Sequence, residues 1–139
     1  MTIEVERKVF EQIIGYSSGL NYETGGFIGI CNHRIHTYFF DDGTRQKGTY
    51  CPNRDIFYEL IEKWGQEGMT AFGIFHTHLN GNPSLSGEDI GYINSIFESN
   101  TDLEEMFFPV IIPEKEICVY LANRKNEEVL INLVALKII

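Results

Sequence analysis

The order of helical and strand patterns along the chain most constrains its fold. Apolar residues recur with helical spacing near residues 6–18, 54–66 and 86–98, and short apolar runs typical of strands occupy the stretches between and after them. The predicted strands are residues 25–31, 34–40, 71–76, 107–112, 117–122 and 129–136. Because helices and strands alternate before a final run of strands, we expect one α/β domain over residues 1–139, a mixed sheet flanked by helices.

The charge of the chain argues against nucleic acid as a partner. The sequence has 20 acidic and 11 basic residues, a formal net charge of −9. Its basic residues do not cluster, because Arg7 and Lys8 are offset by Glu4 and Glu6. Such a chain repels a phosphate backbone, so we expect no binding to nucleic acid.

The cysteines and the apolar runs indicate the compartment. Cys31, Cys51 and Cys118 are odd in number and form no C-x-x-C pair, which is typical of a reducing environment. The N-terminus shows no apolar segment of a secretory signal, and no apolar run approaches the roughly 18 residues of a membrane helix. We therefore expect a cytoplasmic protein without a membrane span.

One short stretch has the residue types of a metal site. His76 and His78 lie two apart at the end of a predicted strand, so their side chains leave the same face. A loop rich in Gly and Pro then leads into a helix whose first turn contains Asp89. Two imidazoles and one carboxylate favour zinc or another late divalent ion and leave a fourth position open, as in catalytic zinc sites.

Each part of this pattern also has a structural interpretation. A His-x-His pair is often an exposed strand end, and the segment from Ser86 to Asp89 is a capping box when taken alone. The metal hypothesis is favoured because the structural interpretation requires both features to fall at this spacing by coincidence. His33 in a predicted hairpin turn and His36 on the adjoining strand are expected to be structural or exposed.

The His-x-His-x7-Ser-x-x-Asp pattern resembles the motif of the JAMM, or MPN-plus, metalloproteases. That family has a further glutamate at the start of the strand after its first helix, and Glu23, followed by Thr24, Gly25 and Gly26, occupies this place. The resemblance covers most of the chain in element order. It implies a curved mixed sheet flanked by helices, a cytidine-deaminase-like α-β-α sandwich.

The resemblance also implies roles for the matching residues. His76, His78 and Asp89 would bind one zinc ion per chain, Glu23 would act as general base, and Ser86 would stabilise the oxyanion. The substrate would be a peptide or isopeptide bond after the C-terminal tail of a ubiquitin-like protein. Residues 41–50 would clamp that tail, and a glycine would precede the scissile bond.

Two departures and two alternatives accompany the resemblance. Many family members have Pro where this chain has Leu79 and Leu85, although neither residue supplies a ligand. A catalytically inactive MPN-type scaffold is one alternative, but such domains typically lose ligands. The other is a peptidase that processes a sulfur-carrier protein.

Overall fold

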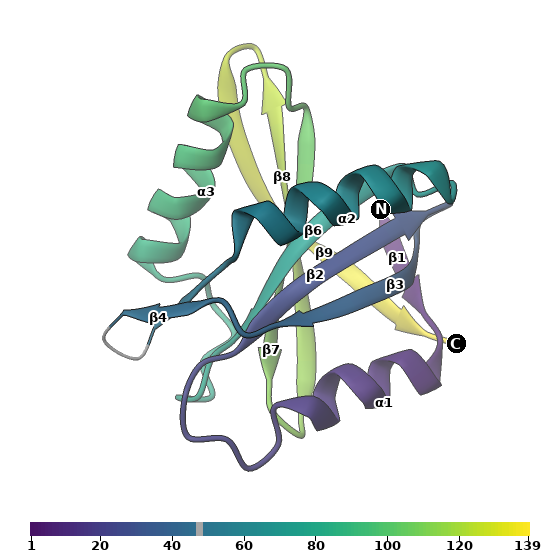
Figure 1. Cartoon of the computed structure of the whole chain (residues 1–139), viewed down its shortest axis with the longest axis vertical. Helices are drawn as coiled ribbons and strands as arrows, with labels where there is room; N and C mark the ends of the chain where they lie inside the picture. Colours follow the sequence, from purple (N-terminus) through teal and green to yellow (C-terminus); the bar gives the residue numbers. More distant parts are fainter. Residues whose placement is uncertain (47–48) are drawn as a thin grey trace.

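A computed structural model describes residues 1–46 and 49–139 of the chain (Figure 1). Its main sheet has the strand order β1-β3-β2-β6-β7-β8-β9 and is closed. These strands are β1 (Thr2–Val5), β2 (Gly25–Cys31), β3 (Arg34–Asp41), β6 (Ala71–Thr77), β7 (Glu105–Ile112), β8 (Glu116–Lys125) and β9 (Glu128–Ile138). A separate two-stranded ribbon consists of β4 (Thr44–Gln46) and β5 (Thr49–Cys51).

Three helices pack against this sheet in the described part of the chain. They are α1 (Arg7–Tyr16), α2 (Arg54–Gln66) and α3 (Gly87–Ser99). No helix among the described residues is long and apolar enough to span a lipid bilayer.

The predicted α-β-α sandwich, a mixed sheet flanked by helices, is wrong, because the seven strands form a closed barrel. Closure depends on β1, which pairs in parallel with both β3 and β9. Within β1, Ile3 and Val5 are fully buried while Thr2 is exposed, the alternation of a strand. An alternation over four residues is too short to stand out in the sequence. Ala135, the residue with which Thr2 pairs, lies at the other end of the chain.

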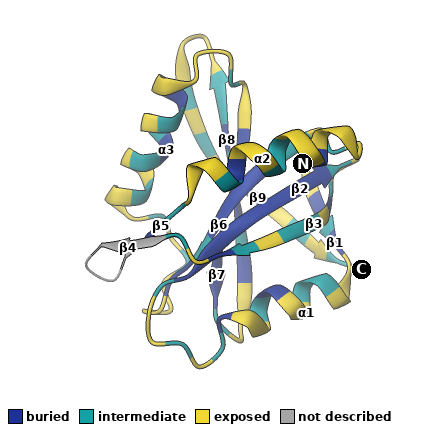
Figure 2. Ribbon diagram, in the orientation of Figure 1, coloured by how far each residue is buried: buried dark blue, intermediate teal, exposed yellow. Residues whose placement is uncertain are grey.

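Alternating side chains of the central strands build two hydrophobic clusters. In β2, Ile28 and Ile30 belong to the cluster that contains Ile13 of α1. Phe27 points to the opposite face, into the cluster of α2 and α3 that contains Trp64. Figure 2 shows the central strands largely buried while the outer faces of the helices are exposed. The candidate site, described below, lies against the second cluster.

Most predicted elements are confirmed, with small shifts at their ends. The 25–31 strand and the 54–66 helix have the predicted bounds. Asn32 and His33, with φ of 51° and 59°, form the predicted hairpin turn, and His33 and His36 are exposed as expected. The stretch expected to clamp a substrate tail, residues 41–50, contains β4 and the first two residues of β5, and neither strand was predicted. Lys47 and Gly48 lie outside the described residues.

Candidate metal centre

Strand β6 places both histidines on the side of the sheet that faces α3. His76 lies between two neighbours, paired with Gly25 of β2 and Val110 of β7. His78 follows the strand end, and its backbone N–H still donates to the carbonyl of Ile111 over 3.0 Å. The ladder therefore holds both histidines in one register, and their side chains leave the same face.

The residue between the histidines is fixed from the opposite face. Thr77 is fully buried, and its hydroxyl accepts a hydrogen bond from the backbone N–H of Thr24 over 2.9 Å. The backbone N–H of Thr77 in turn donates to the carbonyl of Thr24 over 2.9 Å. This double contact fastens the start of β2 to the end of β6, so the two histidines cannot shift along the sheet independently of Glu23.

His76, His78 and Asp89 converge on one point. The two imidazole Nε2 atoms are 2.9 Å apart, and each lies 3.1 Å from one carboxylate oxygen of Asp89. The side chains of His76, His78 and Asp89 are 17%, 9% and 18% exposed, so water reaches the cluster from a limited direction. Bonds of 2.0–2.1 Å in a tetrahedral zinc site hold ligand atoms about 3.3 Å apart. The separations observed here fit that ion with small adjustments.

The hydrogen bonds around the cluster leave it short of positive charge. His78 Nδ1 lies 2.8 Å from the carbonyl oxygen of Asn82, which can only accept, so Nδ1 carries a proton. In a neutral imidazole, Nε2 is then an acceptor, and it faces the carboxylate of Asp89, another acceptor. The cluster therefore requires an additional proton or a bound cation. A backbone carbonyl that fixes the tautomer in this way is common behind metal-binding histidines.

The titration of the cluster follows from these contacts. The hydrogen bond to Asp89 raises the pKa of His78, against the opposing effect of burial. Burial alone would raise the pKa of Asp89, but hydrogen bonds with His76 and His78 outweigh it and hold the pKa of this carboxyl well below its usual range. Asp89 is thus an ionised carboxylate at neutral pH, the form that a metal ligand needs.

The start of α3 positions Asp89. Ser86 is the N-cap, and its hydroxyl accepts from the backbone N–H of Asp89 over 3.1 Å. The carboxylate of Asp89 reaches back to the backbone N–H of Ser86 over 2.9 Å, which completes a capping box. The capping interpretation of this motif is therefore confirmed, and the same carboxylate contacts both histidines.

The loop between the histidines and α3 is held by its own polar side chains. Asn80 accepts from the backbone N–H of Asn82, and Asn82 accepts from that of Ser84. The hydroxyl of Tyr120, on β8, donates to the carbonyl of Pro83 over 2.8 Å. These contacts fix the distance from His78 to the helix that carries Asp89.

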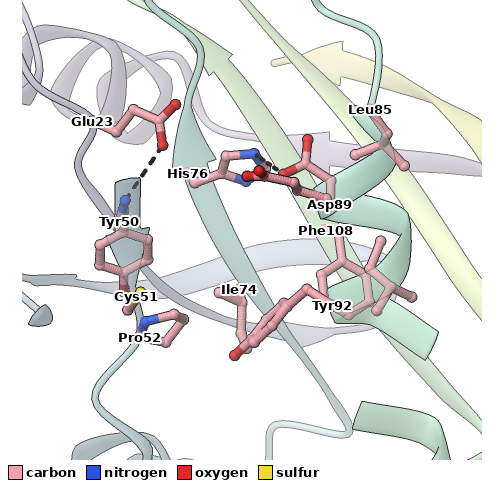
Figure 3. A pocket seen from close by; sticks show the side chains of 12 residues that line it. Glu23, Tyr50, Cys51, Pro52, Ile74, His76, Leu85, Asp89, Tyr92 and Phe108 are labelled. Atoms are coloured by element: carbon pink, nitrogen blue, oxygen red, sulfur yellow. Dashed lines mark hydrogen bonds and ion pairs between the residues drawn. The ribbon is translucent and has the colours of Figure 1, made fainter. Parts of the chain in front are cut away.

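Glu23 lies across a cavity from His76 and Asp89 (Figure 3). It directly precedes Thr24, whose contacts with Thr77 set its position beside the histidines. One carboxylate oxygen, Oε2, accepts from the backbone N–H of Tyr50 over 3.3 Å. The negative charge of Glu23 also contributes to the raised pKa of His78. The structure therefore brings Glu23 into the electrostatic neighbourhood of the cluster.

A buried brace, Asp41 with Tyr50, holds this side of the site. The Tyr50 hydroxyl donates to Oδ2 of Asp41 over 2.8 Å, and the same oxygen accepts from the backbone N–H of Asn53 at the start of α2. Burial and the hydrogen bond to Asp41 raise the pKa of Tyr50. The Tyr50 ring packs on Gly25, where a Cβ atom would lie 2.2 Å from a ring carbon. Only glycine at position 25 allows this approach.

Two hollows meet at the cluster. An apolar cavity of about 240 Å³ lies between β5 and α3, over a floor formed by β6 and β7 (Figure 3). A wider hollow of about 710 Å³ is bounded by the polar loop that includes Asn80 and Asn82. Glu23, Glu88 and Asp89 line both. A substrate bound at the cluster would therefore extend into two different environments.

The structure brings all five predicted site residues into one region, four of them in direct contact. His76, His78, Asp89 and Ser86 are linked by hydrogen bonds, and Glu23 lines the same cavity as His76 and Asp89. Within the described residues, His76, His78 and Asp89 form the one group of at least three His, Cys, Asp or Glu side chains that could hold a metal ion. The sequence did not reveal three supporting residues, Asp41, Tyr50 and Asn82, because their roles depend on contacts across the fold.

Comparison with known proteins identifies the fold alone. No protein-family model matches the sequence, and no curated protein is similar to it. Among solved structures, the chain is similar to the solution structure of protein DSY2949 from Desulfitobacterium hafniense, with a TM-score of 0.64 and 15% sequence identity. That match covers 100% of this chain and 94% of the other.

Proposed function

We propose that this chain is a zinc-dependent peptidase in which His76, His78 and Asp89 hold one zinc ion. The observation that carries the proposal is the convergence of two imidazole nitrogens and an ionised carboxylate within 2.9–3.1 Å of one another. A bound zinc ion would polarise a water molecule and the substrate carbonyl at this point. An apolar cavity beside a few convergent polar groups is the usual setting of an active site.

Glu23 is the general base in this proposal. Its carboxylate would accept a proton from the attacking water and pass it to the leaving nitrogen, while the C–N bond breaks and the water oxygen joins the carbonyl carbon. The backbone N–H of Tyr50 donates a hydrogen bond to Oε2 of Glu23, and this contact orients the carboxylate.

Ser86 is the oxyanion donor in this proposal. Its hydroxyl already accepts from the backbone N–H of Asp89, and a hydroxyl that accepts one hydrogen bond can still donate its own proton. Donation to a developing oxyanion would stabilise the transition state of hydrolysis more than the ground state. The capping role of Ser86 holds its oxygen beside the cluster.

The proposed substrate is the C-terminal tail of a ubiquitin-like protein, cleaved at a peptide or isopeptide bond. This part rests on the resemblance of the His-x-His-x7-Ser-x-x-Asp motif to that of the JAMM proteases.

We place the protein in the cytoplasm because its three cysteines are free thiols in the structure, as a reducing compartment would keep them.

The test is hydrolysis of a ubiquitin-like protein extended by a short peptide, followed by mass spectrometry. Wild-type protein loaded with zinc should release the extension, and protein treated with a chelator should not. A matched Glu23→Gln variant should bind zinc without releasing the extension. A zinc-loaded wild-type protein that cleaves no tail would favour the non-catalytic scaffold and refute the proposed activity.

A further inference from the structure

The carbonyl of Asn82 decides which ring nitrogen of His78 carries the proton. A neutral imidazole has one proton, on Nδ1 or on Nε2. With the Asn82 carbonyl 2.8 Å from Nδ1, the proton lies on Nδ1, and the lone pair of Nε2 is free for a metal ion. If this carbonyl moved away, the proton would be favoured on Nε2, which lies 3.1 Å from the carboxylate of Asp89 and would donate to it. A metal ion would then have to displace that proton.

The hydrogen bonds inside the loop do not fix the position of this carbonyl on the barrel. The backbone N–H of Asn82 donates to Oδ1 of Asn80 over 2.9 Å, and Oδ1 of Asn82 accepts from the backbone N–H of Ser84 over 3.0 Å. Both partners belong to the loop and move with it. All three residues are exposed, so water competes for these bonds. The internal bonds therefore shape the loop, and its position on the barrel requires a contact with the sheet.

Tyr120 supplies a contact between the loop and the sheet. It lies in β8, where it pairs with Phe108 of β7 on one side and Leu133 of β9 on the other. Its ring packs against the second hydrophobic cluster. Its hydroxyl donates to the carbonyl of Pro83 over 2.8 Å, a contact between residues 37 apart in the sequence. Tyr120 is thus held by two neighbouring strands and holds the loop in turn.

The bond between Asn82 and Pro83 transmits this hold to His78. The carbonyl that Tyr120 contacts belongs to Pro83, and the carbonyl that faces His78 belongs to the residue directly before it. The proline ring fixes its own φ at about −65° and confines the preceding residue to extended conformations. Few free torsions separate the two carbonyls, so a restraint on one restricts the direction of the other.

We propose that Tyr120 is a positioning residue for the metal site: through the carbonyls of Pro83 and Asn82, it holds His78 in the tautomer that leaves Nε2 free. The effect on metal binding rests on the proposed function, whereas the tautomer is a property of the metal-free protein. Partners behind metal-binding histidines typically change metal affinity roughly 10–100-fold when they are replaced. We expect about 10-fold for Tyr120, because it acts one residue further from the ring.

The first experiment measures the tautomer in metal-free protein. The NMR shifts of the two ring nitrogens of His78 are recorded at alkaline pH, where the imidazole is neutral. The variant is Tyr120→Phe, which loses the hydroxyl and keeps the ring. We expect the wild type to carry the proton on Nδ1 and the variant to populate the form protonated on Nε2. The same tautomer population in both proteins would overturn the inference.

The second experiment measures zinc affinity by competition with a chelator. Tyr38→Phe is the matched control, because it also loses a tyrosine hydroxyl, one that donates to Gln12 and lies on β3 beside the first hydrophobic cluster. We expect Tyr120→Phe to bind zinc about 10-fold more weakly and Tyr38→Phe to match the wild type. Thermal unfolding verifies that both variants are folded. An unchanged affinity in Tyr120→Phe, or an equal loss in both variants, would overturn the inference.

A double-mutant cycle tests the route through Pro83. Pro83→Ala keeps the carbonyl and frees the torsions that link it to Asn82. In this background, Tyr120→Phe should reduce zinc affinity less than it does in the wild type, because the two changes interrupt one path. Additive losses would show that Tyr120 acts by another route and would overturn the inference.

The outcomes separate this inference from the proposed function. Wild-type protein that binds no zinc would refute the proposed function, and the tautomer in metal-free protein would still decide the role of Tyr120. Zinc bound equally tightly by the wild type and Tyr120→Phe would overturn the inference and leave the peptidase in place.

Discussion

Replacing Asp89 by alanine should remove the metal site and a helix cap together, and the two losses can be measured separately. The Asp89 carboxylate contacts both histidines and accepts from the backbone N–H of Ser86 over 2.9 Å. Loss of a capping interaction costs about 1 kcal/mol. Zinc at 100 times its Kd stabilises the folded state by about 2.7 kcal/mol. For a chain of this size, 1 kcal/mol shifts Tm by roughly 4 °C.

Thermal unfolding with zinc and with a chelator gives both quantities. Wild-type protein should unfold roughly 10 °C higher with zinc at 100 times Kd than with the chelator. With the chelator, Asp89→Ala should unfold roughly 4 °C below the wild type. Zinc should not raise the Tm of this variant.

Ser86→Ala is the matched control for the cap. It removes the hydroxyl that accepts from the backbone N–H of Asp89 but leaves the three proposed ligands in place. It should have a similarly lowered Tm with the chelator while keeping the full increase with zinc. A zinc-induced increase that persists in Asp89→Ala would refute the assignment of this carboxylate as a ligand.

Three further predictions follow from the contacts of the site. Glu23→Gln should keep zinc, measured by elemental analysis, and lose at least ~100-fold in kcat; retained turnover would exclude it as the base. Tyr50→Phe removes the hydrogen bond to buried Asp41 and should cost about 1–3 kcal/mol in urea unfolding; an unchanged midpoint would show that the brace carries no stability. Because the pKa of His78 is raised above the ordinary histidine value of 6.5, protons should begin to weaken zinc binding at a pH above 6.5. Chelator competition across pH measures this, and a zinc affinity that falls only below pH 6.5 would contradict it.

The convergence of the three proposed ligands could be predicted because they are close in sequence and their geometry is local. His76 and His78 share a face by strand periodicity, and Asp89 follows from the capping motif at the start of a helix. Glu23 is distant in the sequence, and only the family resemblance singled it out. Its position in the structure depends on the Thr24–Thr77 contact, which no local pattern announces.

The closed sheet and the brace could not be predicted for a physical reason. Both depend on pairings between distant segments, such as Thr2 with Ala135. Asp41 lies in an Asp-Asp-Gly sequence typical of an exposed turn, yet it is 3% exposed because Tyr50 and Asn53 saturate its oxygen. A tertiary hydrogen bond thus overrides the local preference of the sequence.

The central claim is that His76, His78 and Asp89 hold one zinc ion. Elemental analysis of protein purified without added metal tests it most directly, with His76→Ala and His33→Ala analysed in parallel. We expect one zinc per chain in the wild type and in His33→Ala, whose histidine is exposed in the hairpin turn, and almost none in His76→Ala. A metal-free wild-type protein with full peptidase activity, or zinc retained in His76→Ala, would contradict the claim.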